Sequence, residues 1–306
     1  MVAELGRYVI LLLGEKGQVG HELQSALDGV PSIISLDVPD VDFSRPDSLR
    51  ALLQRHRPDI VINAAAHTAV DKAESESELA FRVNALAPGV LAEEAEALGA
   101  CLVHYSTDYV FDGRKPAPYV ESDTPNPLSV YGRTKFEGEQ SVRACRRHLI
   151  FRTSWVVGAH GHNFIKTILR LAGERDSLRV VADQIGAPTS AALLSKATVK
   201  ILSHMATKPP NDARWGLYHL TAAGETSWHG LASHVIGRAI EMGMPLKVRP
   251  EAVAPIATAD YPVLAQRPAN SRLDTSKLRT TFKMTLPDWK TGVDEVLDRI
   301  IPAMKS

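Results

Sequence analysis

Short apolar runs alternate with amphipathic stretches through the first half of the chain. The apolar runs are bounded by Gly, Pro and Asp, and they predict buried strands over residues 8–13, 32–38, 59–64, 101–106 and 148–153. Helix-forming residues recur at helical spacing over residues 18–26, 48–55, 76–98 and 135–144. This alternation predicts an α/β fold, with a doubly wound, Rossmann-like parallel sheet covered by helices on both faces.

The alternation loosens after Trp155, where a second and smaller lobe begins. A helix at 190–205 and a buried strand at 216–221 then return to the sheet, so the two lobes interleave along the chain. We therefore assign residues 1–157, with 188–222, to a dinucleotide-binding domain. The remaining segments, 158–187 and 223–306, are assigned to a C-terminal substrate-binding lobe with a helix at 164–172, a strand at 178–182 and a final helix at 287–304.

The charge balance excludes a general attraction to polyanions. Lys and Arg number 35, as do Asp and Glu, so no overall field favours nucleic acid or an anionic membrane. An anionic ligand must therefore be held locally. Cys101 and Cys145 are the only cysteines, and they do not form a Cys-x-x-Cys pair, which favours a reducing compartment. Residues 8–13 are too short for a signal peptide, so we expect a cytoplasmic protein.

A glycine-rich turn follows the first predicted strand and opens a helix. Residues 14–20 read Gly-x-x-Gly-x-x-Gly, a turn that lets backbone amides approach a pyrophosphate at the positive end of a helix. Asp37 ends the second predicted strand, 23 residues after Gly14, where a carboxylate accepts hydrogen bonds from an adenosine ribose. Asp37 disfavours a 2′-phosphate, but Lys16 offsets its charge. The choice between NADH and NADPH stays open.

Polar residues follow the next strands at the edge where open parallel sheets bind ligands. Small residues at 64–66, then His67 and Thr68, follow the third strand, and Ser106 and Thr107 lie at the end of the fourth. We expect the small residues to allow close approach of a cofactor. A hydroxyl at Ser106 or Thr107 is suited to polarising a carbonyl group.

Tyr131 and Lys135 are spaced four residues apart, so a helix places both on one face. A free phenol has a pKa of about 10, and a nearby ammonium stabilises the phenolate and lowers that pKa. We therefore expect Lys135 to bring Tyr131 toward the neutral range. Together with a strand-end hydroxyl, the pair is suited to protonating a carbonyl oxygen while a nicotinamide delivers hydride.

The glycine motif, the Ser-Thr-Asp-Tyr-Val-Phe-Asp-Gly segment at 106–113 and the Tyr-x-x-x-Lys motif resemble those of extended short-chain dehydrogenase/reductases. Further segments are similar to the dTDP-4-dehydrorhamnose reductase family, at 63–74, 106–113, 151–156, 186–189 and 267–273. The resemblance covers nearly the whole chain. It implies reduction of the 4-keto group of dTDP-4-dehydro-L-rhamnose to dTDP-L-rhamnose with NADPH or NADH.

The resemblance also implies residue roles. Tyr131 supplies the proton, Lys135 tunes the phenol and holds the nicotinamide ribose, and Thr107 binds the sugar oxygen. The implied cofactor contacts are Gly14, Gly17, Gln18, Val19, Asp37, Asp42, Phe43, Ala66, His67, Thr68, Tyr105, Tyr131 and Lys135. Asp108 and Trp155 join Thr107 as substrate contacts, and Trp155 offers an apolar face to the deoxysugar. Arg267 and Arg272 are further candidates, either as pyrophosphate contacts or as ties between the lobes.

The family pattern is incomplete at one place. Some members hold magnesium at a dimer interface through Glu side chains, and Glu22 matches one of these positions while Ala192 replaces another. Since a methyl group cannot replace an oxygen ligand, we expect no required metal, in a monomer or a homodimer. His160 and His162 lie in a loop and are expected to be solvated.

Two alternative functions are compatible with the same resemblance. A sugar-nucleotide dehydratase carries an Asp-Glu pair after the strand-end Thr, whereas Asp108 here is followed by Tyr109, which argues against elimination of water. Epimerisation stays open. A non-catalytic binding subunit is the alternative from another class, and the presence of Thr107, Tyr131 and Lys135 argues against it.

Overall fold

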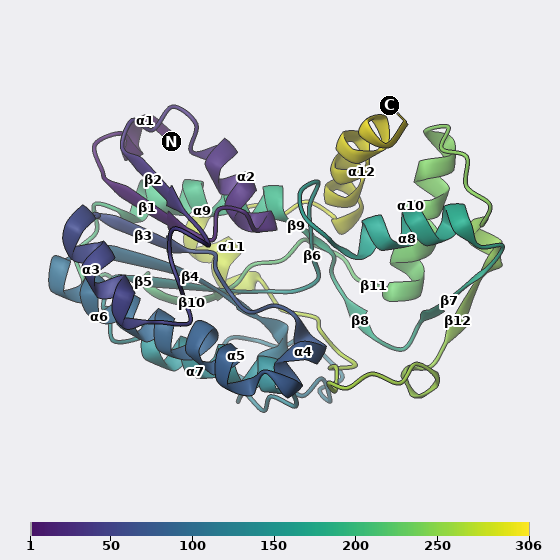
Figure 1. Ribbon diagram of the computed structural model, residues 1–306, viewed down its shortest axis with the longest axis horizontal. Coiled ribbons are helices and arrows are strands. Elements are labelled where there is room, and N and C mark those ends of the chain that lie inside the picture. Colours follow the sequence, from purple (N-terminus) through teal and green to yellow (C-terminus); the bar gives the residue numbers. More distant parts are fainter. Residues whose placement is uncertain (1, 306) are drawn as a thin grey trace.

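A six-stranded parallel sheet forms the centre of the larger of two lobes in the computed structural model, which describes residues 2–305 (Figure 1). Its strands are β1 Ile10–Leu13, β2 Ile33–Leu36, β3 Ile60–Asn63, β4 Cys101–Thr107, β5 His148–Thr153 and β10 Gly216–His219. The order is β10-β5-β4-β3-β1-β2, and every neighbouring pair runs parallel. All six lie within one residue of predicted runs or inside them, and the doubly wound α/β prediction is confirmed.

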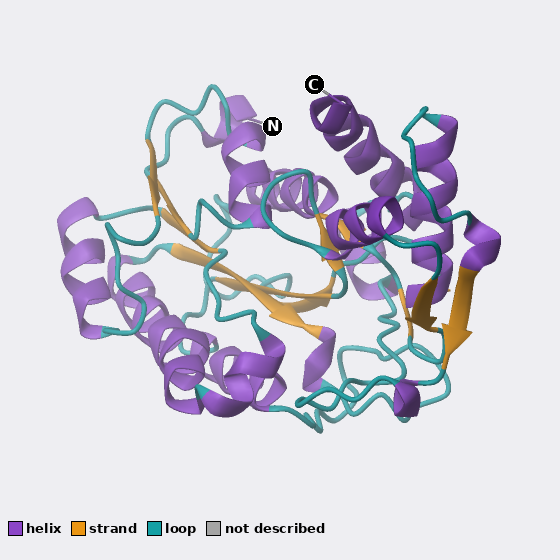
Figure 2. Ribbon diagram, turned by 45° about the vertical axis from the view of Figure 1, so that its right-hand side comes forward, coloured by secondary structure: helices purple, strands orange, loops and turns teal. Residues whose placement is uncertain are grey.

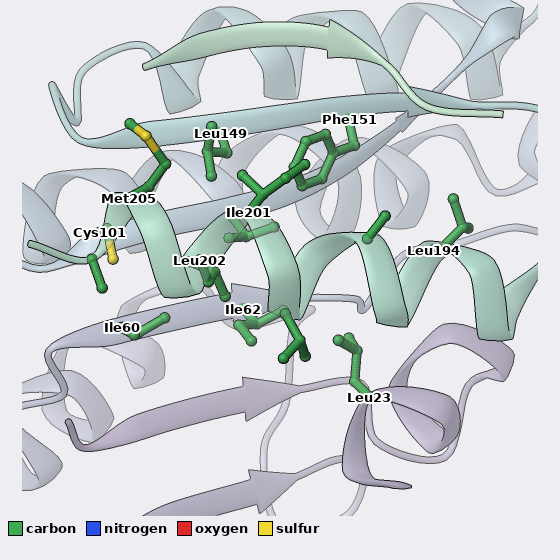
Figure 3. Packing of buried hydrophobic residues seen from close by; sticks show 14 of the residues in the cluster. Leu23, Ile60, Ile62, Cys101, Leu149, Phe151, Leu194, Ile201, Leu202 and Met205 are labelled. Atoms are coloured by element: carbon green, nitrogen blue, oxygen red, sulfur yellow. The ribbon is translucent and has the colours of Figure 1, made fainter. Parts of the chain in front are cut away.

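Helices cover both faces of this sheet. One face carries α1 Val2–Leu5, α2 Gln18–Ala26, α9 Ala191–Met205 and α11 Ser276–Phe282, and the other carries α3 Asp47–His56, α6 Ala87–Leu98 and α7 Val130–Val142. Figure 3 shows α9 lying over the strands, with Leu202 among the buried side chains packed beside Ile62. Burial of such apolar side chains on both faces is the main force that holds the sheet between its helices.

Helix α7 begins at Val130, ahead of the predicted helical stretch at 135–144. The Ser129 hydroxyl caps it by accepting a 3.1 Å hydrogen bond from the Gly132 amide. A Cβ atom at Gly132 would lie 2.2 Å from the carbonyl oxygen of Tyr109, so a glycine is required for this close approach. The cap and the glycine bring the first turn of α7, with Tyr131, against the end of β4.

The predicted helix over 76–98 is divided into three parts. A short helix, α4 Val70–Ser75, precedes this segment. The three parts are α5 Ser77–Phe81, with five residues, then a π-helical turn, η1 Arg82–Leu86, and finally α6. An apolar period near 3.6 residues does not reveal one wider turn. The π turn carries Asn84, whose contacts are described below.

The smaller lobe, whose helices and short strands lie on the right of Figure 2, has its own hydrophobic core. It contains helices α8 Phe164–Glu174, α10 Trp228–Glu241 and α12 Trp289–Lys305, and two strand pairs, β7 Leu178–Val181 with β12 Val253–Ile256 and β8 Ile185–Gly186 with β11 Thr226–Ser227. The pair of β6 Val156–Val157 with β9 Thr189–Ser190 lies where the chain passes between the lobes. The short 3₁₀ turns η3 Pro250–Ala252 and η4 Thr258–Asp260 follow α10, and η2 Asp108–Val110 follows β4 in the larger lobe. The sequence analysis did not predict α10.

The predicted assignment of residues 276–286 to the smaller lobe is wrong. Leu278 and Leu286 pack in the core between the sheet and α9, so residues 276–286 belong with the larger lobe and not with the smaller one. The chain therefore crosses between the lobes two more times than predicted, into the larger lobe before α11 and back into the smaller lobe before α12. In the part of the chain that the structure describes, no helix is both long and apolar enough to span a membrane.

Candidate active site

The glycine turn joins β1 to α2 at the carboxyl edge of the sheet. Gly14 has a φ of +84°, and a Cβ there would lie 2.5 Å from the Ala65 amide nitrogen, so the turn tolerates only glycine. Gly17 is the residue before α2 and has no side chain to cap it, which leaves the first amides of the helix to a ligand, next to Gln18 and Val19. These residues fit a dinucleotide pyrophosphate.

The expected adenosine contacts follow β2. The Asp37 carboxylate accepts hydrogen bonds from the amides of Lys16 at 2.9 Å and Val38 at 2.7 Å, so it braces the glycine turn and lies beside it. Phe43 is buried, whereas Asp42 is exposed and accepts bonds from the Ser44 hydroxyl and amide, which lower the pKa of its carboxyl group. Asp37 therefore lies close to the glycine turn, where the adenosine is expected.

Gln18 links the turn to the smaller lobe. Its Oε1 accepts a 3.0 Å hydrogen bond from Nδ2 of Asn163, which also donates to the Gly158 carbonyl oxygen at 2.6 Å. The His160 ring stacks on His21 of α2 with centroids 4.1 Å apart. His160 is exposed, as expected, although its ring also contacts His21. The sequence analysis did not single out Asn163 as a functional residue, because nothing in the local pattern connects it to a position 145 residues away.

Asn84 holds the segment after β3. Its Oδ1 accepts from the His67 amide at 2.8 Å, and its Nδ2 donates to the His67 carbonyl oxygen at 3.1 Å and to Thr134 of α7 at 3.2 Å. The His67 ring meets Glu76 at 2.9 Å, and Ala66 and Thr68 flank it at positions that are not fully buried. Asn84 therefore fixes the expected nicotinamide edge. The sequence analysis missed this residue because it lies within an apparently regular helix.

The Lys135 ammonium group reaches β4 from α7. It donates to the Tyr105 carbonyl oxygen at 2.6 Å and lies 3.5 Å from Nε2 of His104. Burial lowers the pKa of Lys135 to about 8. Burial also lowers the pKa of His104 well below its usual value, so that ring is neutral beside the ammonium.

Tyr131 faces Thr107 across the gap between α7 and β4. Burial raises the pKa of the Tyr131 phenol to about 12, and the nearby Thr107 hydroxyl offsets part of that rise. The expectation that Lys135 brings this pKa toward neutrality is therefore wrong for this arrangement, since desolvation dominates. The phenol stays protonated at neutral pH. Thr107, Tyr131 and Lys135 do come together, as the spacing and the sheet edge predicted.

Asp108 lies directly beside this group. Its Oδ1 accepts a 3.1 Å hydrogen bond from the Thr107 hydroxyl, and Ser271 of the segment before α11 also bonds to it. Burial raises the pKa of Asp108 to about 6 in spite of both bonds. The Tyr109 ring packs edge-to-face on Tyr131 at 5.4 Å. Ser271 was not named individually by the sequence analysis, although it lies in one of the resembling segments.

Two expected contacts have side chains engaged in the protein core. Trp155, with a φ of +48°, is 9% exposed, and Trp228 covers one face of its indole with ring centroids 3.6 Å apart. Gly186 also packs against this indole, since a Cβ there would lie 2.7 Å from Trp155 Cε2, so the ring has little surface left for a sugar. The Tyr105 hydroxyl bonds to Thr198 of α9 at 2.6 Å, so its side chain points into the core and not along the cleft.

The two candidate arginines form internal contacts. Arg267 pairs with Asp71 of α4 at 2.7 Å, which supports the reading that it ties the lobes together. Arg272 bonds to Asn270 and to Glu225. Glu22, the position that matches a magnesium ligand, pairs with Arg299 of α12 at 2.6 Å. Among residues 2–305, no group of three or more His, Cys, Asp or Glu is placed to hold a metal ion. That no metal is required stays a prediction.

Comparison with known proteins gives a consistent family. The family model described as RmlD substrate binding domain matches residues 8–301. The chain is 47% identical over 296 residues to a dTDP-4-dehydrorhamnose reductase of Escherichia coli K12, covering 95% of this chain and 97% of the relative.

Solved structures agree with this result. A dTDP-4-dehydrorhamnose reductase from Clostridium acetobutylicum has a TM-score of 0.86 at 37% identity, with 94% of this chain and 98% of that chain covered. The same enzyme from Bacillus anthracis, solved in complex with NADP, has a TM-score of 0.85 at 35% identity with the same coverage, 94% and 98%. The chain thus resembles these proteins over both lobes.

Proposed function

This chain belongs to the RmlD substrate binding domain family, and we infer that it is an NAD(P)H-dependent oxidoreductase, a dTDP-4-dehydrorhamnose reductase. It reduces the 4-keto group of dTDP-4-dehydro-L-rhamnose to give dTDP-L-rhamnose, the last step in the biosynthesis of this activated sugar. One observation carries the inference within the molecule: Tyr131 faces Thr107 at the carboxyl edge of the sheet, and Lys135 reaches the neighbouring Tyr105 carbonyl oxygen from the next turn of α7.

The reduction needs a hydride at the carbonyl carbon and a proton at the oxygen. The bound reduced nicotinamide supplies the hydride. Tyr131 supplies the proton, and a pKa of about 12 keeps that proton in place until an alkoxide forms. The Lys135 ammonium, one helical turn from Tyr131, provides a positive charge near the phenolate that remains. Proton donation by a neutral phenol is the direction that a reductase requires.

We assign the cofactor to the larger lobe. Gly14, Gly17, Gln18 and Val19 hold the pyrophosphate, the segment at 37–43 lies around the adenosine, and residues 66–68 with Lys135 face the nicotinamide half. The tight turn at Gly14 and the uncapped start of α2 support this assignment. The sugar nucleotide lies against Thr107 and Asp108, with Trp155 nearby. We assign residues 1–157, 188–222 and 276–286 to the cofactor lobe and the rest to the substrate lobe.

The cellular setting follows from the chemistry of the substrates. A nicotinamide and a dTDP-linked sugar are cytoplasmic metabolites, so we propose a cytoplasmic enzyme. It acts as a monomer or a homodimer. No nucleic acid and no membrane partner is part of the proposal, in keeping with the formal net charge of zero.

A cofactor-consumption assay tests the function. Purified protein is mixed with NADPH or NADH and dTDP-4-dehydro-L-rhamnose made in situ, and loss of reduced-nicotinamide absorbance is compared with dTDP-rhamnose formed. Stoichiometric conversion is expected. The Tyr131→Phe variant should lose about 10²–10⁴-fold in turnover with unchanged cofactor affinity. Tyr8→Phe, at the opposite end of β1, is the matched control and should keep full activity. Cofactor binding without consumption would instead favour an epimerase or a binding subunit.

A further inference from the structure

A buried polar network lies behind the residues that act on the substrate. Glu139, on α7, accepts a 2.5 Å hydrogen bond from the Ser106 hydroxyl on β4. Arg152, on β5, donates to both Glu139 oxygens, from Nε at 2.8 Å and from Nη2 at 2.6 Å. Exposure is 0% for Glu139, 1% for Arg152 and 4% for Ser106. Burying an ion pair at this depth gives little net stability, so its presence calls for another explanation.

The position of Glu139 suggests what that explanation is. It follows Lys135 by one helical turn, so both side chains project from the same face of α7. Ser106 lies between Tyr105, whose carbonyl oxygen accepts from Lys135, and Thr107, which faces Tyr131. Glu139 thus holds Ser106, the β4 residue whose two neighbours contact Lys135 and face Tyr131.

The charges around Lys135 single out Glu139. His104, which faces the ammonium from β4, is neutral because burial lowers its pKa. Tyr131, on the preceding turn of α7, is protonated because its pKa lies near 12. Burial lowers the pKa of Lys135, and the carboxylate of Glu139 acts in the opposite direction. Asp108 is the remaining acid, and its charge acts on Tyr131.

Arg152 contacts Glu139 from the side of β5. Its guanidinium lies 5.0 Å from the Phe111 ring centroid, and its Nη1 is buried without a hydrogen-bond partner within residues 2–305. His219, the titratable group on β10 beside Arg152, is neutral because burial lowers its pKa to about 3. Arg152 therefore orients the Glu139 carboxylate through two parallel hydrogen bonds.

We propose that Glu139 is a positioning residue for reduction, held by Arg152 and Ser106, which keeps the Lys135 ammonium charged and keeps Thr107 aligned with Tyr131. The proposal rests on the function inferred above, because it assigns Glu139 to the same reaction. Glu139 touches neither substrate nor cofactor, and it acts through Lys135 and Ser106.

The test is the pH profile of Glu139→Gln. We expect the alkaline limb of kcat, along which Lys135 loses its proton, to move to lower pH by roughly one unit, because the carboxylate that favours the charged form is gone. Glu137→Gln is the matched control: it removes the same charge from the exposed face of α7 and should leave the profile unchanged. An unmoved limb in a folded Glu139→Gln enzyme would overturn the proposal.

A second variant guards against misfolding, since Glu139→Gln leaves the Arg152 charge buried and unpaired. The double variant Glu139→Gln/Arg152→Met removes both charges at similar volume. Its alkaline limb should still lie below that of the wild type, and a wild-type limb would contradict the proposal.

A binding measurement separates this proposal from the proposed function. The dissociation constant of NADPH, followed by fluorescence from pH 6 to pH 10, reports Lys135 without turnover. Affinity should weaken at lower pH in Glu139→Gln than in the wild type or Glu137→Gln. If the wild type binds NADPH but does not reduce the sugar, the function fails, and the binding profile still decides the role of Glu139.

Discussion

Arg267 of the smaller lobe and Asp71 of the larger lobe form a cross-lobe ion pair, with Nη2 and Oδ2 2.7 Å apart. The same carboxylate accepts a 3.1 Å hydrogen bond from the Ala265 amide. Asp71 therefore anchors the start of the segment that continues to Ser271, which bonds to Asp108 in the site. Through this segment the pair joins the position of the smaller lobe to the substrate contacts.

Substitution of Asp71 by Asn should loosen this connection. Because the two side chains are 23% and 41% exposed, the pair contributes only about 0.5–1 kcal/mol. We expect KM for the sugar nucleotide to rise about two- to fivefold in steady-state assays, with little change in kcat or in KM for the cofactor. Glu174→Gln breaks an exposed pair with Arg170 inside α8 and serves as the control. Equal effects of the two variants would contradict the cross-lobe role.

Gly14 and Gly29 provide a matched pair for the cofactor turn. Both have positive φ, +84° and +86°, but a Cβ at Gly14 meets the Ala65 backbone at 2.5 Å, whereas a Cβ at Gly29 has nothing within 4 Å. Gly29→Ala should lower the free energy of unfolding by about 1–2 kcal/mol from backbone strain alone, with normal cofactor affinity. Gly14→Ala should cost more and should weaken cofactor binding at least tenfold in a titration. Similar cofactor affinity in the two variants would refute a required close approach.

Asp108 should make the stability of the chain depend on pH. Burial raises its folded pKa to about 6, above the usual 3.8, so its contribution to stability is complete below about pH 4 and is lost as pH rises through 6. The loss amounts to roughly 2–3 kcal/mol. Asp108→Asn cannot ionise, so it should be more stable than the wild type at pH 7.5, with the advantage shrinking toward pH 4.

Urea unfolding at pH 4, 5 and 7.5 measures this difference. Asp28→Asn, at an exposed position, is the control and should differ little from the wild type at every pH. If Asp108→Asn is no more stable than the wild type at pH 7.5, the carboxylate is not destabilised by burial as proposed.

The sequence by itself determined the features that depend on local pattern. Apolar runs identified all six strands of the main sheet, because a buried parallel strand has to be apolar on both faces. The glycine turn at residues 14–20 could be recognised because strand, turn and helix follow one another directly in the sequence. Tyr131 and Lys135 could be identified as a pair because four-residue spacing places two side chains on one helical face. Thr107 could be placed near them because the carboxyl ends of parallel strands meet at one edge of the sheet.

Only the tertiary structure decided which distant groups meet and how deeply they are buried. Asn84 reaches His67 because a π turn redirects its side chain, and a period of 3.6 residues does not reveal that turn. Glu139 and Arg152 lie on different elements and meet only when α7 packs on the sheet. The pKa of Tyr131 depends on desolvation, which spacing along the chain does not encode. Composition and period specify the elements, whereas burial and long-range contacts set the chemistry of the site.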